Sequence, residues 1–401
     1  MDSMKPNVLV IGQGYVGFPL AFAAAQAGYQ VFGYDKNPHV ISSLKLGIDH
    51  TSTVIKSEIT ELIDKGKINF INELPLEKNF RIIVVCVPTP LTELGVPDLS
   101  YLDLALNEIA RLISHGTLLV IESTIATGTT RNHILPIISK STLMSESELN
   151  IAFAPERIDP GNKNWNLENT PKLLAALSEN ALSLAREFYG TFVKNIVICN
   201  SVEIAETAKL LENSFRLVNI SFINEISNFC HKIGIDINEV ISSAATKPYG
   251  FMTFYPSLGV GGHCIPVDPI YLLEESRNVG SPITMVELAN KINDTQPQIF
   301  VNSIIKKYGN LTNKQILVLG VAYKPNVSDI RETPVKKLIQ CLEANGAEVY
   351  WHDELVKEWN GSKSTSLSHE FDLAILATPH DYFDLSKLGD VPIFNTRGSI
   401  L

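Results

Sequence analysis

Short apolar runs alternate with longer stretches of helical periodicity through the first half of the chain. The runs are nearly continuous in Val, Ile and Leu, and they lie at 8–11, 31–35, 81–87, 117–122, 151–154 and 196–198. Strands of this composition have both faces covered, as in a parallel sheet between two layers of helices. The pattern therefore predicts a doubly wound α/β domain, placed at residues 1–199.

An uninterrupted helical stretch follows this domain. Residues 202–233 contain neither Gly nor Pro, Asn200 and Ser201 are candidate N-cap residues, and Gly234 suits the C-terminal end. At 1.5 Å per residue the stretch predicts one helix on the order of 45 Å long. Its apolar residues cover more than one stripe, so we expect burial on several sides, between domains or between subunits. We place a central helical domain at 200–300 and expect an obligate dimer built on this helix.

The third part of the chain, residues 301–401, repeats the strand and helix pattern on a smaller scale. Thr333 and Pro334 form an N-cap and N1 pair for a helix that Gly346 ends. Only Gly320 stands where the first domain has three glycines, so a second dinucleotide is not expected here. The predicted fold class is α/β, with two Rossmann-like doubly wound domains joined by a long central helix and a helical dimerisation region. The segment 315–334 predicts a strand followed by a long turn, and further strands are predicted at 347–353, 373–378 and 393–398.

Composition and charge exclude several classes of protein. The chain has 401 residues, 45% of them hydrophobic, as expected for two or three folded domains. Lys and Arg number 33 against 43 Asp and Glu, a net charge of -10, so no overall positive field attracts nucleic acid or an anionic membrane. Neither a signal-peptide pattern nor a run of 18 apolar residues occurs. We therefore expect a soluble protein in the cytoplasm.

A candidate dinucleotide-binding loop, Gly-Gln-Gly-Tyr-Val-Gly at 12–17, follows the first predicted strand and opens a helix. The first glycine permits the tight turn, the second lets a pyrophosphate approach the backbone, and the third lets helix and strand pack. Asp35 ends the next strand, where a carboxylate accepts from a ribose 2′-hydroxyl and repels a 2′-phosphate, so NAD is expected over NADP. Pro88 and Thr89 follow the end of one later predicted strand, and Ser123 and Thr124 follow the end of another. These residues either contact NAD or simply cap their loops. The candidate NAD-binding residues are Gly12, Gly14, Tyr15, Val16, Gly17, Asp35, Pro88, Thr89, Ser123 and Thr124.

One of the five cysteines stands apart from the others. No CxxC or Cys/His metal spacing occurs, so neither a metal site nor a disulfide framework is expected, and a reducing compartment is indicated. In Gly-Gly-His-Cys-Ile-Pro-Val-Asp at 261–268, two glycines remove bulk beside Cys264, and a predicted helix from about Pro269 would favour its thiolate. Cys264 is the candidate nucleophile, the alternative being a structural thiol in a glycine-rich loop. The remaining thiols have the apolar or helical context of inert cysteines: Cys86, Cys199, Cys230 and Cys341.

Several charged or polar residues complete the candidate chemistry. Lys209 and Asn213 are four residues apart and share one face of the long helix, where they either form a site or face solvent. Glu156 follows a predicted strand and is either an acid/base or a loop residue. A further group at the edge of the second α/β domain suggests recognition of a second phosphate-bearing ligand. That group consists of Lys324, Asp329, Arg331 and Arg397.

Together these motifs resemble the UDP-glucose/GDP-mannose dehydrogenase family. The resemblance extends from about Val8 to Arg397, in the order NAD-binding domain, helical dimer domain and UDP-binding domain. Several independent motifs carry it: GQGYVG, CVPTP, EST (122–124), APERIDPG, KLLEN (209–213), GVGGHCIPVDP (259–269) and YKPNVSDIRETP (323–334).

The resemblance implies an NAD-dependent, four-electron oxidation of the sugar C6 hydroxyl to a uronate. It implies that Cys264 is the nucleophile of a thiohemiacetal and thioester, that Lys209 and Asn213 steady the C6 oxygen, and that Asp268 helps to place a water. Glu156 serves acid/base chemistry in thioester hydrolysis. Arg331 and Arg397 match arginines that contact cofactor or substrate, and we assign Arg331 to the cofactor. The implied substrate-binding residues are Glu156, Arg157, Lys209, Asn213, Lys247, Phe251, Tyr255, Gly261, Lys324 and Arg397.

The motif variants favour one branch of the family. PERIDPG, GHCIPVDP and KPYGFMTFYP (247–256) are more similar to enzymes of UDP-N-acetylhexosamines than to those of glucose. UDP-N-acetylglucosamine is the first choice, with UDP-N-acetylgalactosamine, UDP-N-acetylmannosamine and UDP-glucose as alternatives. The chain departs from the family pattern at Leu173-Leu174-Ala175-Ala176, where a glycine pair is usual, and at Asn395, where Asp is common.

Two other functions compete with this interpretation. A single-hydride β-hydroxyacid dehydrogenase also combines an NAD domain with a Lys/Asn helix, but it has no use for Cys264 or the second α/β domain. A nucleotide-sugar or NAD sensor without turnover would not need the thiol, lysine and acid positions to be filled. The expected partners are therefore a UDP-sugar and further copies of the chain, as a homodimer or higher homo-oligomer.

Overall fold

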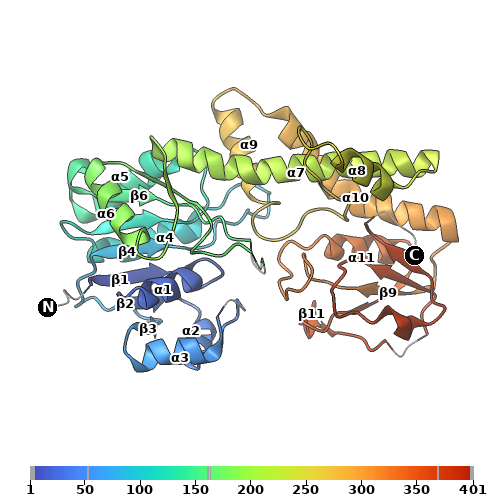
Figure 1. The fold of residues 1–401 in the computed structure, drawn as a ribbon, viewed down its shortest axis with the longest axis horizontal. Helices are drawn as coiled ribbons and strands as arrows, with labels where there is room; N and C mark the ends of the chain where they lie inside the picture. The colour runs from blue at the N-terminus through green and yellow to red at the C-terminus, as the bar shows by residue number, and fades with distance from the viewer. Residues whose placement is uncertain (1–4, 52–53, 160–161, 163, 368–369, 398–401) are drawn as a thin grey trace. The chain divides into compact units, whose positions relative to one another are not determined.

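The structure, a computed structural model, describes residues 5–51, 54–159, 162, 164–367 and 370–397. It divides into two compact units, 1–211 and 212–401 (Figure 1). The division of the chain into domains at 1–199, 200–300 and 301–401 stays a prediction. Pro160 and Gly161 of the APERIDPG motif and Gly398 after Arg397 lie outside the described residues.

The first unit is built on an eight-stranded sheet with the order β3-β2-β1-β4-β5-β6-β7-β8. The strand order reverses between β1 and β4, where sheets of this kind bind ligands beyond the carboxyl ends of the strands. All neighbouring strands are parallel except β6 and β7, which run antiparallel. The strands are β1 (Asn7–Ile11), β2 (Gln30–Tyr34), β3 (Ile68–Ile71), β4 (Ile82–Val85), β5 (Leu118–Ile121), β6 (Asn150–Phe153), β7 (Lys172–Ala176) and β8 (Ile196–Ile198).

The strands expected from the apolar runs of this unit are all present, whereas β3 and β7 were not predicted. The sequence of β3 is INFI, in which a polar residue interrupts the apolar run. The sequence of β7 is KLLAA, in which a polar residue precedes the apolar run. The expectation of a wholly parallel sheet is wrong at β7 and β8, which run parallel to each other and opposite to the other strands. Apolar composition reports burial but not strand direction, so this reversal had no signal in the pattern.

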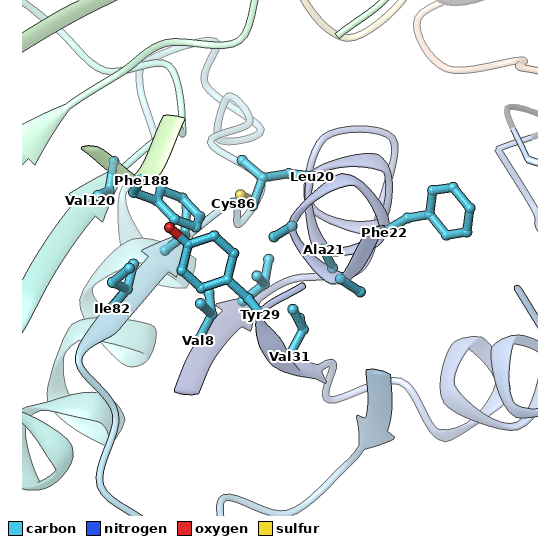
Figure 2. Close-up of a cluster of buried hydrophobic side chains, with 14 of the residues drawn as sticks. Val8, Leu20, Ala21, Phe22, Tyr29, Val31, Ile82, Cys86, Val120 and Phe188 are labelled. Atoms are coloured by element: carbon cyan, nitrogen blue, oxygen red, sulfur yellow. The ribbon is translucent and has the colours of Figure 1, made fainter. Parts of the chain in front are cut away.

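Both faces of the first sheet are buried at the central strands β1, β2, β4, β5 and β6, as the continuous apolar runs predicted, whereas the apolar run of the edge strand β8 is partly exposed, with Val197 at 46% and Ile198 at 40%. Val8 and Val10 of β1 pack into one hydrophobic cluster, while Leu9 and Ile11 between them pack into another. Successive strand residues point to opposite faces, so both sets must be apolar. Figure 2 shows part of the first cluster, in which Leu20 of α1 lies next to Cys86 and Phe22 points away from it. The helices are α1 (Gly17–Gln26), α2 (Pro38–Lys45), α3 (Lys56–Asp64), α4 (Ser100–Ile109), α5 (Leu135–Thr142) and α6 (Glu179–Tyr189), with short turns η1 (Ala110–Leu112), η2 (Thr130–Ile134) and η3 (Glu146–Glu148).

The long helix α7 (Val202–Ile233) has the predicted bounds and is 32 residues long (Figure 1). Ser201 Oγ accepts from Ile204 N at 3.4 Å at its start, and Gly234 beyond its end has φ +76°. That left-handed conformation costs glycine little and other residues more. Near the start of the helix, buried Glu206 accepts from Thr130 N at 2.9 Å, which fixes the helix to the preceding domain.

The second unit contains a four-stranded parallel sheet with the order β10-β9-β13-β14. The predicted helix of this unit is present, but it begins at Val335, with Pro334 at the N-cap rather than at N1. Thr333 still caps it, because its Oγ1 accepts from Val335 N at 3.3 Å. The elements are α8 (Ile237–Ala245), α9 (Asp268–Asn278), α10 (Thr284–Tyr308), β9 (Gln315–Leu319), α11 (Val335–Ala344), β10 (Glu348–His352), β11 (Glu358–Trp359), β12 (Ser362–Lys363), β13 (Leu373–Leu376), η4 (Leu385–Leu388) and β14 (Ile393–Asn395).

Among the described residues, no helix combines the length and the apolar character that crossing a bilayer requires. The same residues contain no cluster of three or more His, Cys, Asp or Glu side chains that could hold a metal ion.

Candidate active site

The three glycines of the 12–17 loop differ in whether the surrounding atoms leave room for a side chain. Gly12 has φ +87°, and a Cβ there would lie 2.5 Å from the carbonyl oxygen of Cys86. A Cβ on Gly17 would lie 1.8 Å from the carbonyl oxygen of Gly12. At Gly14, in contrast, no atom of the described residues lies within 4 Å of a Cβ position. Packing therefore requires Gly12 and Gly17, while Gly14 leaves open space beside the N-terminus of α1, where backbone N–H groups favour a phosphate.

The carboxylate of Asp35 is held beside this loop. Its Oδ2 accepts from Gln13 N and its Oδ1 from Asn37 N, both at 2.8 Å. Asp35 lies just beyond β2, in the place that a ribose-binding acid occupies in dinucleotide folds. Tyr15 of the loop also lines a pocket of about 870 Å³ with Phe22 of α1, but neither Asp35 nor the three glycines line that pocket. The open glycine and the oriented acid fit an NAD.

The residues beyond β4 and β5 lie at the predicted edge of the sheet. Thr89 and Ser123 are buried, Thr124 is half-buried and Pro88 is exposed. Ser123 Oγ donates to Val87 O at 2.7 Å and so connects the two loops. These loops border the point where the strand order reverses, which agrees with the cofactor role expected for them.

Glu156 is a buried, ionised carboxylate just beyond β6. Its Oε1 accepts from the N–H groups of Arg157 and Ile158, each at 2.7 Å, and its Oε2 accepts from Lys172 Nζ at 3.0 Å. Burial raises the pKa of Glu156, but the charge of Lys172 and these hydrogen bonds outweigh burial and lower it. The side chain of Arg157 donates to the backbone at Pro171 O, 2.7 Å away.

Lys209 and Asn213 are both buried on α7, with 7% and 8% of their surface exposed, so the solvent-facing alternative is wrong. Asn213 Nδ2 donates to Oδ2 of Asp268 at 2.5 Å. Asp268 is the first residue of α9 and is 2% exposed. The predicted Asn213 and Asp268 are therefore in direct contact, although 55 residues separate them along the chain.

Cys264 is the exposed thiol among the five cysteines, all of which lie in the described residues. Cys86 and Cys230 are buried, and Cys199 and Cys341 are partly buried. The carbonyl oxygen of Cys264 accepts from Asp268 N at 2.8 Å, which closes the turn that leads into α9. The contrast in exposure agrees with the prediction that one thiol is available for chemistry.

The glycines before Cys264 join two of the predicted motifs. Gly262 N donates to Arg331 O at 2.9 Å, and a Cβ on Gly262 would lie 2.9 Å from the ring of Tyr323. A Cβ on Gly261 would lie 2.8 Å from the Tyr323 Cβ. The glycine pair therefore makes room for Tyr323, and it places the Cys264 turn directly against the 323–334 loop of the second unit.

His263 is a neighbour of the thiol that the sequence interpretation did not select. Burial lowers the pKa of His263, the positive charge of Arg331 lowers it further, and Asp329 opposes both. A neutral imidazole is thus favoured next to Cys264 in the chain. Its position within the GGHC motif was the available signal.

The charged residues of the second unit are only partly brought together. Arg331 pairs with Asp329, with 2.6 Å between Nη2 and Oδ2, and Lys324 is half-buried on the same loop. Arg397 is exposed, and its N–H donates to Asn395 Oδ1 at 2.9 Å. An Asp would accept that bond with the same geometry, so the departure at Asn395 preserves the turn that carries Arg397.

The other departure from the family pattern, at 173–176, and the remaining candidate substrate-binding residues lie outside the Arg331 and Arg397 contacts just described. Ala175 and Ala176 belong to strand β7, and Ala175 pairs with Phe153 of β6, so the missing glycine pair lies in a strand and not in a loop. Lys247, Phe251 and Tyr255 are exposed in the segment between α8 and α9.

Fold and site together define a dinucleotide-dependent dehydrogenase with a second α/β domain. Residues 6–193 match the NAD-binding domain of the UDP-glucose/GDP-mannose dehydrogenase family, residues 203–295 its central domain, and residues 317–398 its UDP-binding domain. The chain belongs to the UDP-glucose/GDP-mannose dehydrogenase family, and it is an NAD-dependent nucleotide-sugar 6-dehydrogenase. This assignment excludes the β-hydroxyacid dehydrogenase and the sensor without turnover.

Relatives of known activity and structure cover nearly the whole chain. UDP-N-acetyl-D-mannosamine dehydrogenase of Pyrococcus horikoshii is 32% identical over 94% of this chain and 90% of its own. UDP-N-acetyl-D-glucosamine 6-dehydrogenase of Salmonella typhi is 30% identical over 100% and 96%. A solved structure of UDP-D-ManNAc dehydrogenase from Pyrococcus horikoshii superposes with a TM-score of 0.89 at 31% identity, covering 98% of this chain and 95% of that one.

Proposed function

We propose that this protein oxidises the C6 hydroxyl of a UDP-N-acetylhexosamine to the uronate, with two NAD reduced per sugar, to supply polysaccharide or glycoconjugate synthesis. The observation that carries the proposal is the single exposed thiol, Cys264, on a turn packed against the 323–334 loop of the domain that matches the UDP-binding model. A four-electron oxidation needs such a nucleophile, because an aldehyde loses a second hydride only after an addition has made its carbon tetrahedral.

NAD would be held by the 12–17 loop, by Asp35 and by the loops that contain Thr89 and Ser123. When bound, it accepts the hydrides that the sugar gives up. Asp35 favours a ribose with a free 2′-hydroxyl, because its carboxylate accepts from that group and repels a phosphate. Arg331 is a further candidate for the cofactor, and its pairing with Asp329 fixes its side chain.

The remaining chemistry belongs to the side chains of this protein. The Cys264 sulfur adds to the aldehyde carbon and gives a thiohemiacetal, whose oxidation leaves a thioester. Lys209 offsets the negative charge on the C6 oxygen of the sugar. Asn213, on the same face of α7, donates a hydrogen bond to that oxygen. Glu156 then takes a proton from water as the water oxygen attacks the thioester carbonyl, and the sulfur of Cys264 leaves as the thiolate. Asp268 helps to place that water.

The sugar is proposed from the motif variants and from the relatives, whose printed activities are on UDP-N-acetylmannosamine and UDP-N-acetylglucosamine. The decisive experiment gives purified protein NAD with UDP-glucose, UDP-N-acetylglucosamine, UDP-N-acetylgalactosamine or UDP-N-acetylmannosamine. An N-acetylhexosamine should give the highest kcat/KM, with two NADH per sugar. A preference for UDP-glucose would contradict the substrate class, and one NADH per sugar would contradict the thioester route.

We also propose a homodimer that forms through α7. One face of this helix carries large apolar side chains at spacings of seven and four residues, and each is 45–60% exposed in the single chain. Residues at these spacings share a helix face, and an apolar stripe of this kind favours a partner. The stripe consists of Ile204, Leu211, Phe215, Phe222, Phe229 and Ile233.

Sedimentation equilibrium tests the dimer. The protein should have twice the mass of the chain at micromolar concentration, and Phe222→Glu should shift it toward the monomer because a charge would be buried in the contact. Leu143→Glu is the matched control, since Leu143 is 92% exposed and lies outside the stripe. A monomeric wild-type protein would rule out this dimer.

We propose the cytoplasm as the location of the protein, because the spacing of its five cysteines indicates a reducing compartment.

A further inference from the structure

Four buried polar side chains form a connected cluster in the first unit. Lys172 Nζ lies 2.8 Å from Oε1 of Glu122 and 3.0 Å from Oε2 of Glu156. Tyr189 Oη donates to the same oxygen of Glu122. The four residues come from four places: the ends of β5 and β6, the start of β7 and the end of α6. None is more than 9% exposed, so water screens these charges little.

We propose that Lys172 is a positioning residue that keeps Glu156 a carboxylate and aims it, with Glu122 and Tyr189 holding Lys172 in place. This inference rests on the proposed role of Glu156 as the base of thioester hydrolysis. The two backbone N–H groups occupy Oε1 of Glu156, and Lys172 occupies one side of Oε2. The remaining acceptor position on Oε2 is the one at which Glu156 can receive a proton.

The need for Lys172 follows from burial. A carboxyl group removed from water takes the neutral form unless a cation or hydrogen-bond donors favour the anion, and a neutral Glu156 cannot act as a base. The ionisable groups that face it are Lys172 on β7, Glu122 beyond β5, Tyr189 on α6 and Cys86 beyond β4. Lys172 is the one cation among these four groups.

The rest of the cluster restrains the lysine rather than the acid. Burial raises the pKa of Glu122 to about 7, although Lys172 and Tyr189 oppose this effect. The pKa of Lys172 is raised because its two carboxylate neighbours outweigh the cost of its burial. Lys172 therefore keeps its charge, and burial raises the pKa of Tyr189 and of Cys86 so that both remain neutral. Lys172 thus pairs with two acids whose pKa values shift in opposite directions: the pKa of Glu122 is raised and that of Glu156 is lowered.

A purely structural ion pair is the alternative, and a matched pair of variants separates the two roles. Glu122→Gln removes the second acid but leaves Lys172 on Glu156. Lys172→Met/Glu122→Gln leaves Glu156 buried with no cation, while the cluster as a whole stays neutral once Glu156 is protonated. Comparing these two proteins isolates the effect of Lys172 on one carboxyl group. Lys172→Arg in the Glu122→Gln protein tests rescue by a retained charge.

The expected result is a shift in pH dependence. Glu156 works as a base only above its own pKa, so uronate release in a single turnover falls as pH drops through that value. Between Glu122→Gln and the double variant, this acid limb should move to higher pH by about 1–3 units, the usual effect of removing an adjacent opposite charge. Lys172→Arg should move it back. An unchanged limb would overturn the inference, even if the double variant is slower at every pH.

Infrared spectroscopy with isotope-labelled glutamate gives a readout independent of turnover. The band of a protonated carboxyl should appear at higher pH in the double variant than in Glu122→Gln. If the band shifts while the protein oxidises no UDP-sugar, the inference about Lys172 stands and the proposed function fails. If activity is normal and the band does not shift, the proposed function stands and the inference fails.

Discussion

Replacing Cys264 by serine is expected to lower uronate formation by about 10³-fold or more. The serine hydroxyl is a much weaker nucleophile than a thiolate at neutral pH, and a serine ester does not match the reactivity of a thioester. Any sugar that reacts should stop at the aldehyde or at an ester adduct. The measurement is uronate by mass spectrometry together with NADH by absorbance, and the ratio of NADH to uronate should rise far above two.

Cys341→Ser is the matched control for this change. Cys341 lies in the same compact unit on α11, is partly buried and is free, so it has the same chemistry without the exposed turn. Its replacement should leave both products unchanged. If Cys264→Ser made uronate at the wild-type rate, Cys264 would have no covalent role. Water would then have to add directly to the carbon of the aldehyde intermediate before the second oxidation.

The glycine loop supports a second prediction, in which two similar substitutions have different effects. Gly17→Val should lower the free energy of unfolding by at least about 3 kcal/mol, because its Cβ would meet the Gly12 carbonyl oxygen at 1.8 Å and backbone cannot move aside cheaply. Gly14→Val should fold normally, since its Cβ points into open space. It should instead weaken NAD binding by about tenfold or more, because the side chain fills the space that a pyrophosphate needs.

Two measurements check this prediction. Urea unfolding gives the loss of stability, and titration calorimetry with NAD gives the dissociation constant of each folded variant. The two variants are matched controls for each other, because the same side chain is added at two glycines of one loop, and only the Cβ on Gly17 meets the backbone. Equal losses of stability at Gly14 and Gly17 would contradict the separate roles of these glycines.

The candidate residues of the site could be selected from local sequence wherever one short segment contains them. The 12–17 loop, Asp35 and the Cys264 turn each combine residue types whose physical roles depend on their immediate neighbours. Asn213 and Asp268 were both selected, yet their direct contact was not predicted, because a contact across 55 residues has no local pattern. Lys172 was not selected, and Glu122 was quoted only within the EST motif without a role, for a related reason: a single charged residue beside an apolar strand has the same sequence pattern whether it is exposed or paired in the core.

By itself, the sequence determined the periodicities, and with them the parallel core of the first sheet, the helix at 202–233 and the second α/β domain. These features follow from local rules, since burial of both strand faces and the absence of Gly or Pro leave one regular structure favoured. The tertiary structure alone decided the reversed direction of β7 and β8, the packing of Gly261 and Gly262 against Tyr323, and the pairing of Lys172 with two acids. Each of these depends on which distant segments meet, and the free energy of a buried charge or a close backbone contact is set by that partner rather than by sequence neighbours.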